Sequence, residues 1–152
     1  MNSSLQPVLP IAADADALRR ALRRAGVAHD SRLLVTGPAG LTALIWLYRH
    51  DYPQAVYVPA NRVADLHTAG DALLIPHACR TEELAEMLGD GHCVREGGAL
   101  IVQAPVMRQA ELITVPTVLE RVGFEVETQL AGRRHRIYVA RRVGADGFRK
   151  AA

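Results

Sequence analysis

Residues 33–48 read LLVTGPAGLTALIWLY, in which a short apolar run is followed by a glycine turn and an apolar, helix-forming segment. Strand, glycine turn and helix in this order are typical of an α/β sheet that presents backbone N–H groups to a nucleotide-like ligand. The turn, Gly37-Pro38-Ala39-Gly40, lacks the Gly-Lys-Ser/Thr that completes a phosphate-binding P-loop. Two roles stay open for it, a cradle for a cofactor or anion and a tight strand-to-helix connection.

The rest of the chain continues the alternation of apolar strands with helices. Asp14 and Asp16 favour the start of the first helix, and Thr81 is expected to cap a later one. The pattern predicts helices at 14–25, 41–50, 82–89 and 110–122, and strands at 32–36, 55–58, 71–75, 99–103, 124–130 and 136–142. Apolar strands of the parallel type that alternate with helices and end in a hairpin indicate a three-layer, doubly wound, mostly parallel α/β sheet.

The length of 152 residues suits one domain with a substantial core. We expect this domain at 14–143, with a flexible arm at 1–13 and a frayed tail at 144–152. The first residues lack the charged and apolar regions of a signal peptide. The longest apolar run, 41–47, is too short to cross a bilayer. The expected location is therefore the cytoplasm, with no membrane partner.

A family resemblance lies between Asp71 and Gln103. An acidic residue opens a short strand, an amphipathic helix follows, and the turn at 94–98 leads into the strand ALIVQ. This segment resembles the second half of class I S-adenosylmethionine-dependent methyltransferases. VLERVGFEVE, followed by RIYVARR, is similar to the last helix and closing hairpin of that family. The resemblance covers roughly residues 30–143 and implies a Rossmann-like methyltransferase fold with S-adenosylmethionine as cofactor.

The first half of the chain departs from that family where the cofactor is held. The family's glycine turn reads acidic-x-G-x-G-x-G, but Ala39 replaces the middle glycine here and Pro38 removes an N–H donor. The second strand should end in an acid that binds the ribose, and Asn61 is the nearest polar side chain. Loss of such a charge-assisted bond weakens binding by about 1.5–3 kcal/mol. The residues expected at a cofactor that is held weakly or not at all are Thr36, Gly37, Pro38, Ala39, Gly40, Pro59, Asn61 and Pro76.

A second departure is the short connection that follows Val58. The family fits a helix, an edge strand and another helix there, whereas 61–68 can form one short helix at most. We therefore expect a six-stranded sheet whose second strand is an exposed edge. Exposed edges invite pairing with another chain. A homodimer is expected, formed through Val56 and Tyr57 of this strand or through the apolar helix that carries Trp46.

His77 follows the third strand at the carboxyl edge of the sheet, where ligands of open α/β sheets bind. The resemblance places this loop opposite the methyl acceptor, so His77 is the candidate catalytic base, against the plainer role of a surface histidine. The spacing of His77, Cys79, His92 and Cys93 fits no usual structural zinc pattern, and we expect no metal.

Arginines cluster at 19–24 and at 133–142, which raises the question of nucleic-acid binding. The net charge is only +2, and few aromatic side chains accompany these arginines to stack on bases. Nucleic acid is therefore the less favoured partner.

The sequence favours a methyltransferase-like domain with reduced cofactor contacts that serves as a structural, dimerising or regulatory module. Two alternatives stay open: a functioning methyltransferase that acts on a small molecule or a protein, and a nucleic-acid-binding module that uses the arginines. Direct binding of S-adenosylmethionine separates the module with reduced cofactor contacts from a functioning methyltransferase.

Overall fold

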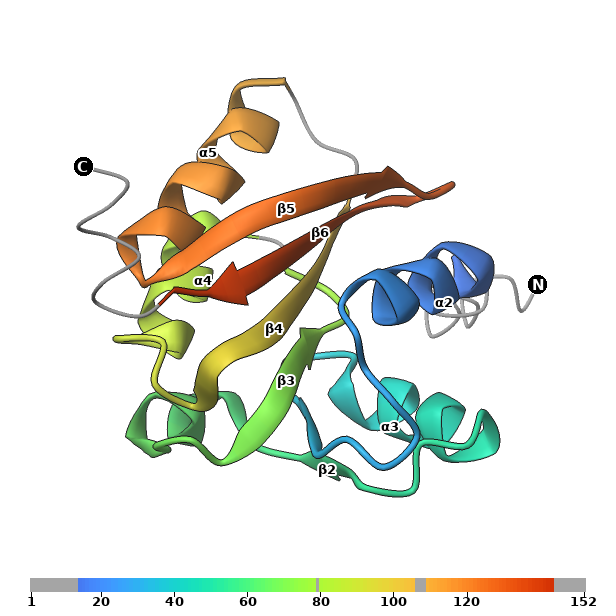
Figure 1. Ribbon diagram of the computed structural model, residues 1–152. Coiled ribbons are helices and arrows are strands. Elements are labelled where there is room, and N and C mark those ends of the chain that lie inside the picture. The colour runs from blue at the N-terminus through green and yellow to red at the C-terminus, as the bar shows by residue number, and fades with distance from the viewer. Residues whose placement is uncertain (1–13, 79, 106–108, 144–152) are drawn as a thin grey trace.

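Six strands form one sheet in the order β2-β1-β3-β4-β6-β5 (Figure 1). The computed structural model describes residues 14–78, 80–105 and 109–143, so the arm, the tail and Cys79 lie outside the described residues. The strands are β1 (Leu33–Val35), β2 (Ala55–Tyr57), β3 (Gly70–Ile75), β4 (Val94–Pro105), β5 (Phe124–Ala131) and β6 (His135–Arg142). Strands β2, β1, β3 and β4 run parallel, and β4, β6 and β5 pair antiparallel.

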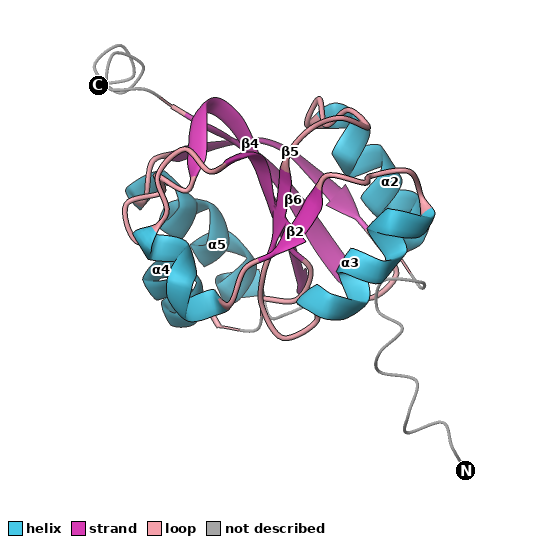
Figure 2. Ribbon diagram, turned by 90° about the horizontal axis from the view of Figure 1, so that it is seen from below, coloured by secondary structure: helices cyan, strands magenta, loops and turns pink. Residues whose placement is uncertain are grey.

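Helices cover both faces of the sheet, which confirms the expected three-layer α/β architecture (Figure 2). One face carries α2 (Ala15–Arg24) and α3 (Gly40–Arg49). The other carries α4 (Thr81–Leu88), α5 (Gln109–Arg121) and the 3-10 helix η2 (Ala60–Asp65). The expected reduction to six strands is also confirmed, because η2 alone fills the connection between β2 and β3.

Successive side chains of the central strands point to opposite faces of the sheet, and this alternation builds two apolar cores. In β1, Leu33 and Val35 pack toward α2 and α3, while Leu34 packs toward α4 and α5. Strands buried on both faces need apolar residues at every position, which is why their sequences read as unbroken runs. Phe124 and Tyr138 extend the second core beneath the closing hairpin.

Two expectations are wrong in detail. Thr81 is the first residue of α4 rather than its cap, because Arg80 occupies the cap position and makes no side-chain capping bond. The pair Gly97-Gly98 lies inside β4, at an irregularity in its pairing with β3, rather than in a turn before the strand. Gly98 is needed there because a Cβ would lie 2.3 Å from a methyl group of Val94.

The apolar helix α3 is less buried within this chain than its sequence suggests. Leu41, Ile45 and Tyr48 are exposed by 60%, 53% and 51%. Trp46 is half-buried against the first core, and its ring stacks on His50 at 4.1 Å. The exposed side of α3 is therefore the one formed by Leu41, Ile45 and Tyr48.

Asp71 connects three strands at the amino edge of the sheet. Its carboxylate accepts a hydrogen bond of 2.8 Å from the backbone N–H of Arg32, next to β1, and one of 3.0 Å from the side chain of Arg95 in β4. The Arg32 N–H is the main reason that the pKa of Asp71 lies below its ordinary value, and Arg95 lowers it further. Asp71, the acid near the start of β3, thus has a structural role here.

We predict that Asp71→Asn lowers the free energy of unfolding at pH 7 by about 0.5–1 kcal/mol, since the side chain is partly exposed. Because the native pKa is depressed, this contribution is complete above the unfolded pKa near 4 and is lost as the pH falls through the native pKa. Urea unfolding at pH 7 and at pH 3 measures it. Asp90→Asn, at an exposed turn, is the control and should change neither value.

Candidate functional site

The ends of the parallel strands gather the residues that the sequence singled out at one edge of the sheet. The turn at 37–40 follows β1, Asn61 follows β2, and His77 follows β3. His135 starts the antiparallel strand β6 at the same edge, opposite Pro105 at the end of β4. This carboxyl edge is where open α/β sheets bind ligands.

The glycine turn satisfies part of its own hydrogen bonding. Gly40 donates its N–H to the carbonyl of Gly37 at 3.0 Å, and Pro38 has no N–H to offer. Gly37 has φ +96°, which explains why it is glycine. A Cβ on Gly40 would lie 2.7 Å from the ring of Tyr57, so this glycine is required by the chain's own packing. The turn therefore keeps few free donors for a ligand.

A cavity of about 340 Å³ opens beside this turn. Pro38 and Asn61, two of the expected cofactor contacts, line it together with Ala60. Its other wall is α4, which contributes Glu83, Glu86 and Met87. The carboxylates missing from the strand ends are thus supplied from a helix on the other side of the cavity.

The remaining expected contacts do not line this cavity. Pro59 is exposed, and Pro76 is buried at the end of β3. Thr36 is fully buried, and its hydroxyl has no hydrogen-bond partner in the described part of the chain. The side-chain amide of Gln103, near the end of β4, is likewise buried without a described partner. Orphaned polar groups of this kind call for an explanation such as a bound polar ligand.

His77 is the outer member of an array of three polar side chains. Its Nδ1 lies 3.3 Å from Nε2 of His135, and Nδ1 of His135 lies 2.8 Å from a carboxylate oxygen of Asp14. The side chains of His135 and Asp14 are only 3% and 1% exposed. His77 itself is half-buried, so the array leads from the interior toward the surface.

The carboxylate of Asp14, at the buried end of this array, determines which nitrogen of each histidine ring carries a proton. A carboxylate only accepts, so His135 carries its proton on Nδ1 and donates it to Asp14. In the neutral ring Nε2 of His135 is then an acceptor, and His77 donates from Nδ1. This leaves a lone pair on Nε2 of His77. Burial lowers the pKa of His77, which favours its neutral form, and a proton on His135 would lower that pKa further.

The closing hairpin fixes the carboxylate of Asp14. The backbone N–H groups of Arg133 and Arg134, in the turn between β5 and β6, both donate to it. Gly132 leaves room for this approach, because a Cβ there would lie 2.6 Å from an oxygen of Asp14. The carboxylate therefore joins the start of α2 to the hairpin turn and to His135.

Sequence reasoning identified His77 but missed both of its partners. Asp14 was expected to favour the start of the first helix, yet it occupies the cap position without a capping bond from its side chain. His135 lies just outside the strand predicted at 136–142, whereas in the structure it is the first residue of β6. The available signal was the period-2 pattern of β6, in which His135 shares the face of buried Ile137 and Val139.

Other candidate sites gain no support. Within the described ranges, no group of three or more His, Cys, Asp or Glu side chains could hold a metal ion. Cys93 is buried, and its burial raises the pKa of the thiol to about 11. No helix in the described part of the chain is long and apolar enough to span a membrane.

Among the comparisons with known proteins, only the comparison of structures finds matches, and these identify the fold. No protein-family model and no curated protein sequence matches the chain. The ribosomal protein L11 methylase from Lactobacillus delbrueckii subsp. bulgaricus superposes with a TM-score of 0.66 at 12% identity, over 86% of this chain and 79% of that one. The chain has the class I methyltransferase fold.

Two further structures show how far this likeness extends. Haemonchus contortus phosphoethanolamine N-methyltransferase 2 matches with a TM-score of 0.65 at 11% identity, over 86% of this chain but only 38% of that one. The [4+2]-cyclase SpnF matches with a TM-score of 0.57 at 16% identity, over 86% and 82%. The methyltransferase-like fold therefore does not by itself specify the reaction.

We predict that Asp14→Ala lowers the free energy of unfolding by about 3–5 kcal/mol, because it leaves the buried ring N–H of His135 and the part-buried N–H groups of the hairpin turn without an acceptor. Asp16→Ala, an exposed change in the first turn of the same helix, should cost less than about 0.5 kcal/mol. Urea titration of both variants makes the comparison, and equal losses would show that Asp14 acts only through the helix.

Proposed function

We propose that the chain is a small methyltransferase that holds its adenosyl cofactor weakly and uses His77 as a base toward a small-molecule or protein acceptor. The observation that carries this proposal is the array Asp14–His135–His77 at the carboxyl edge. Within this array burial lowers the pKa of His77, and ionisable groups with perturbed pKa values cluster at functional sites. This observation shifts the balance from the non-catalytic module that the sequence favoured.

The residues around the cavity fit an adenosyl group. Pro38 and Met87 offer apolar surface to a base, and Asn61, Glu83 and Glu86 offer partners for hydroxyl and amino groups. When bound, S-adenosylmethionine supplies an electrophilic methyl group on sulfur. The two carboxylates take over the role of the absent acid at the end of β2, although α4 presents them from the opposite wall.

His77 can accept a proton from the acceptor at Nε2 while its Nδ1–H remains bonded to His135. The positive charge that then forms on His77 is stabilised through His135, whose other nitrogen donates to the carboxylate of Asp14. His135 and Asp14 are positioning residues in this scheme. The low pKa of His77 keeps the ring neutral near pH 7, which is the form that a base requires.

Titration calorimetry with S-adenosylmethionine and S-adenosylhomocysteine tests the cofactor site. We expect saturable binding of both that weakens about tenfold in Glu86→Gln, which removes a charge-assisted bond. Glu82→Gln changes a neighbouring residue of α4 outside the cavity and should bind as the wild type does. The absence of any heat or thermal shift at millimolar ligand would overturn the proposal.

His77→Gln separates catalysis from binding. We expect it to leave the affinity for S-adenosylhomocysteine within about twofold, yet to slow methyl transfer at least about 100-fold. Transfer of labelled methyl groups from S-adenosylmethionine into a metabolite extract and into protein provides the measurement. Equal rates for His77→Gln and wild type would refute the role of the base.

A second candidate is a non-catalytic dimerising module, which one observation favours. Leu41, Ile45 and Tyr48 lie at positions i, i+4 and i+7 of α3 and form an exposed apolar stripe, with Val56 of β2 exposed by 40%. Contiguous apolar surface on a small domain marks an interaction site. The occupant we propose is a second copy of the chain, seated on this stripe.

The edge of β2 is less open to strand pairing than its position suggests. The hydroxyl of Tyr48 donates to the carbonyl of Ala55 at 2.9 Å, and the N–H of Ala55 donates to the carbonyl of Tyr52 at 3.3 Å. Both polar groups of Ala55 thus have partners within the chain. The helical stripe is therefore the better supported of the two dimer surfaces.

Sedimentation at micromolar concentration tests this surface. We expect a dimer mass for the wild type and weakening of the dimer by roughly tenfold to a hundredfold in Ile45→Glu, which removes a buried apolar contact. Gln129→Glu adds the same charge on the opposite edge strand β5 and should leave the dimer intact. A monomer mass for the wild type would exclude the module.

A further inference from the structure

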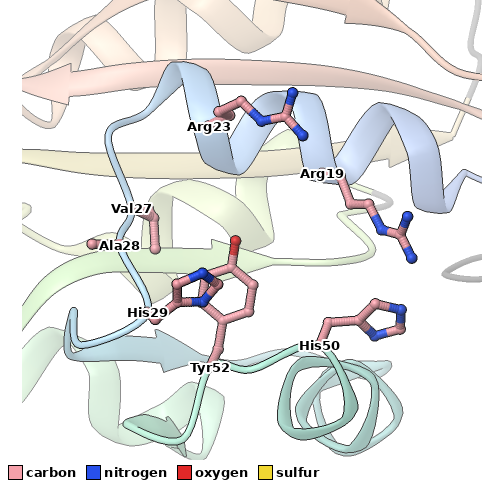
Figure 3. A pocket seen from close by; sticks show the side chains of 7 residues that line it. All are labelled: Arg19, Arg23, Val27, Ala28, His29, His50 and Tyr52. Carbon is pink, nitrogen blue, oxygen red and sulfur yellow. The ribbon is translucent and has the colours of Figure 1, made fainter.

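A second cavity, of about 290 Å³, lies at the amino edge of the sheet, away from the site described above. Its residues come just before β1 and β2 or from α2, and Figure 3 shows them from close by. Arg19 and Arg23 extend from α2 along one side, and Tyr52 directs its hydroxyl toward that helix from the other (Figure 3). The complete lining is Arg19, Arg23, Val27, Ala28, His29, His50 and Tyr52.

The two guanidinium groups bring positive charge that the described part of the chain does not neutralise. Arg19 and Arg23 are four residues apart, so they share one side of α2. None of the ion pairs in the described ranges involves either of them, and no carboxylate lines the cavity. Their charges also act on the phenol of Tyr52. Burial raises the pKa of this phenol above its ordinary value, and the charges of Arg23 and Arg19 offset part of that rise.

The two histidines are held by backbone carbonyls. Nδ1 of His29 lies 2.8 Å from the carbonyl of Asp51, and Nδ1 of His50 lies 2.7 Å from the carbonyl of Trp46. Carbonyls only accept, so both rings donate from Nδ1 and keep Nε2 for another partner. Such a nitrogen accepts the proton of an acidic ligand or, when protonated, donates to its oxygens.

We infer that this cavity binds a small phosphorylated molecule, whose phosphoryl oxygens lie between Arg19 and Arg23. Guanidinium groups bond phosphate oxygens in pairs, and the hydroxyl of Tyr52 adds a further donor. The rings of His29 and Tyr52, 5.5 Å apart, give the remainder of the ligand a partly apolar wall. The volume holds several times the space of one water, which exceeds a bare phosphate and suits a diphosphate or a phosphate ester.

A compact ligand fits these observations better than a nucleic-acid strand does. Arg19 and Arg23 line a single hollow, whereas a strand needs a groove of positive charge with stacking platforms along it. The neighbouring hollow, lined by Arg20, Arg23, Arg24 and Leu130, holds no aromatic ring. It therefore supplies arginines for a matched control on the same helix.

Calorimetric titration with inorganic pyrophosphate at low salt tests the inference. The double variant Arg19→Gln/Arg23→Gln should bind at least about tenfold more weakly than the wild type. The double variant Arg20→Gln/Arg24→Gln removes the same charge from α2 and should keep the wild-type affinity within about twofold. All four positions are exposed, and thermal unfolding checks that both proteins stay folded.

Tyr52→Phe should weaken pyrophosphate binding severalfold as a second, uncharged change within the cavity. Equal losses in the two double variants, or undetectable binding to the wild type, would overturn the inference. A single-stranded RNA that binds the wild type and weakens equally in both double variants would show a diffuse basic surface instead. Saturating S-adenosylhomocysteine should not compete with pyrophosphate, because the two proposed sites lie at opposite edges of the sheet. A negative result for pyrophosphate therefore leaves the proposed cofactor site untouched.

Discussion

A single buried carboxylate determines how the layers of this domain meet. Asp14 accepts hydrogen bonds from two N–H groups of the hairpin turn and from His135, and it lies at the start of the helix that covers the first core. A buried charge is tolerated only when it is fully paired. The position of α2, the conformation of the hairpin turn and the orientation of the His135 ring are therefore fixed together.

Much of the fold could be predicted because central parallel strands are buried on both faces. Runs such as those in β1 and β3 must be apolar at every position, and their order with the helices and the hairpin then indicates the topology. The length of the connection after Val58 was enough to predict the loss of a strand. The irregularity of β4 at Gly97 and Gly98 was not predictable, because it depends on a pairing with β3 that is far away in sequence.

The candidate site was predictable only where position along a strand determines it. His77 and Asn61 follow strands and so had to lie at the carboxyl edge. Glu83 and Glu86 lie on α4, and their place opposite the glycine turn depends on how that helix packs on the sheet. Asp14 is separated from His135 by 121 residues, and no local pattern joins two such residues.

The hydrogen bond from the hydroxyl of Tyr48 to the carbonyl of Ala55 affects how readily the outer strand β2 can pair with another chain. A sheet that loses an outer strand exposes a new template on which chains can add to one another without limit. Here the new outer strand has only three residues, and an aromatic side chain from the adjoining helix bonds one of its outward groups. A single phenol thus helps to protect the outer strand of this six-stranded sheet from fibre-like growth.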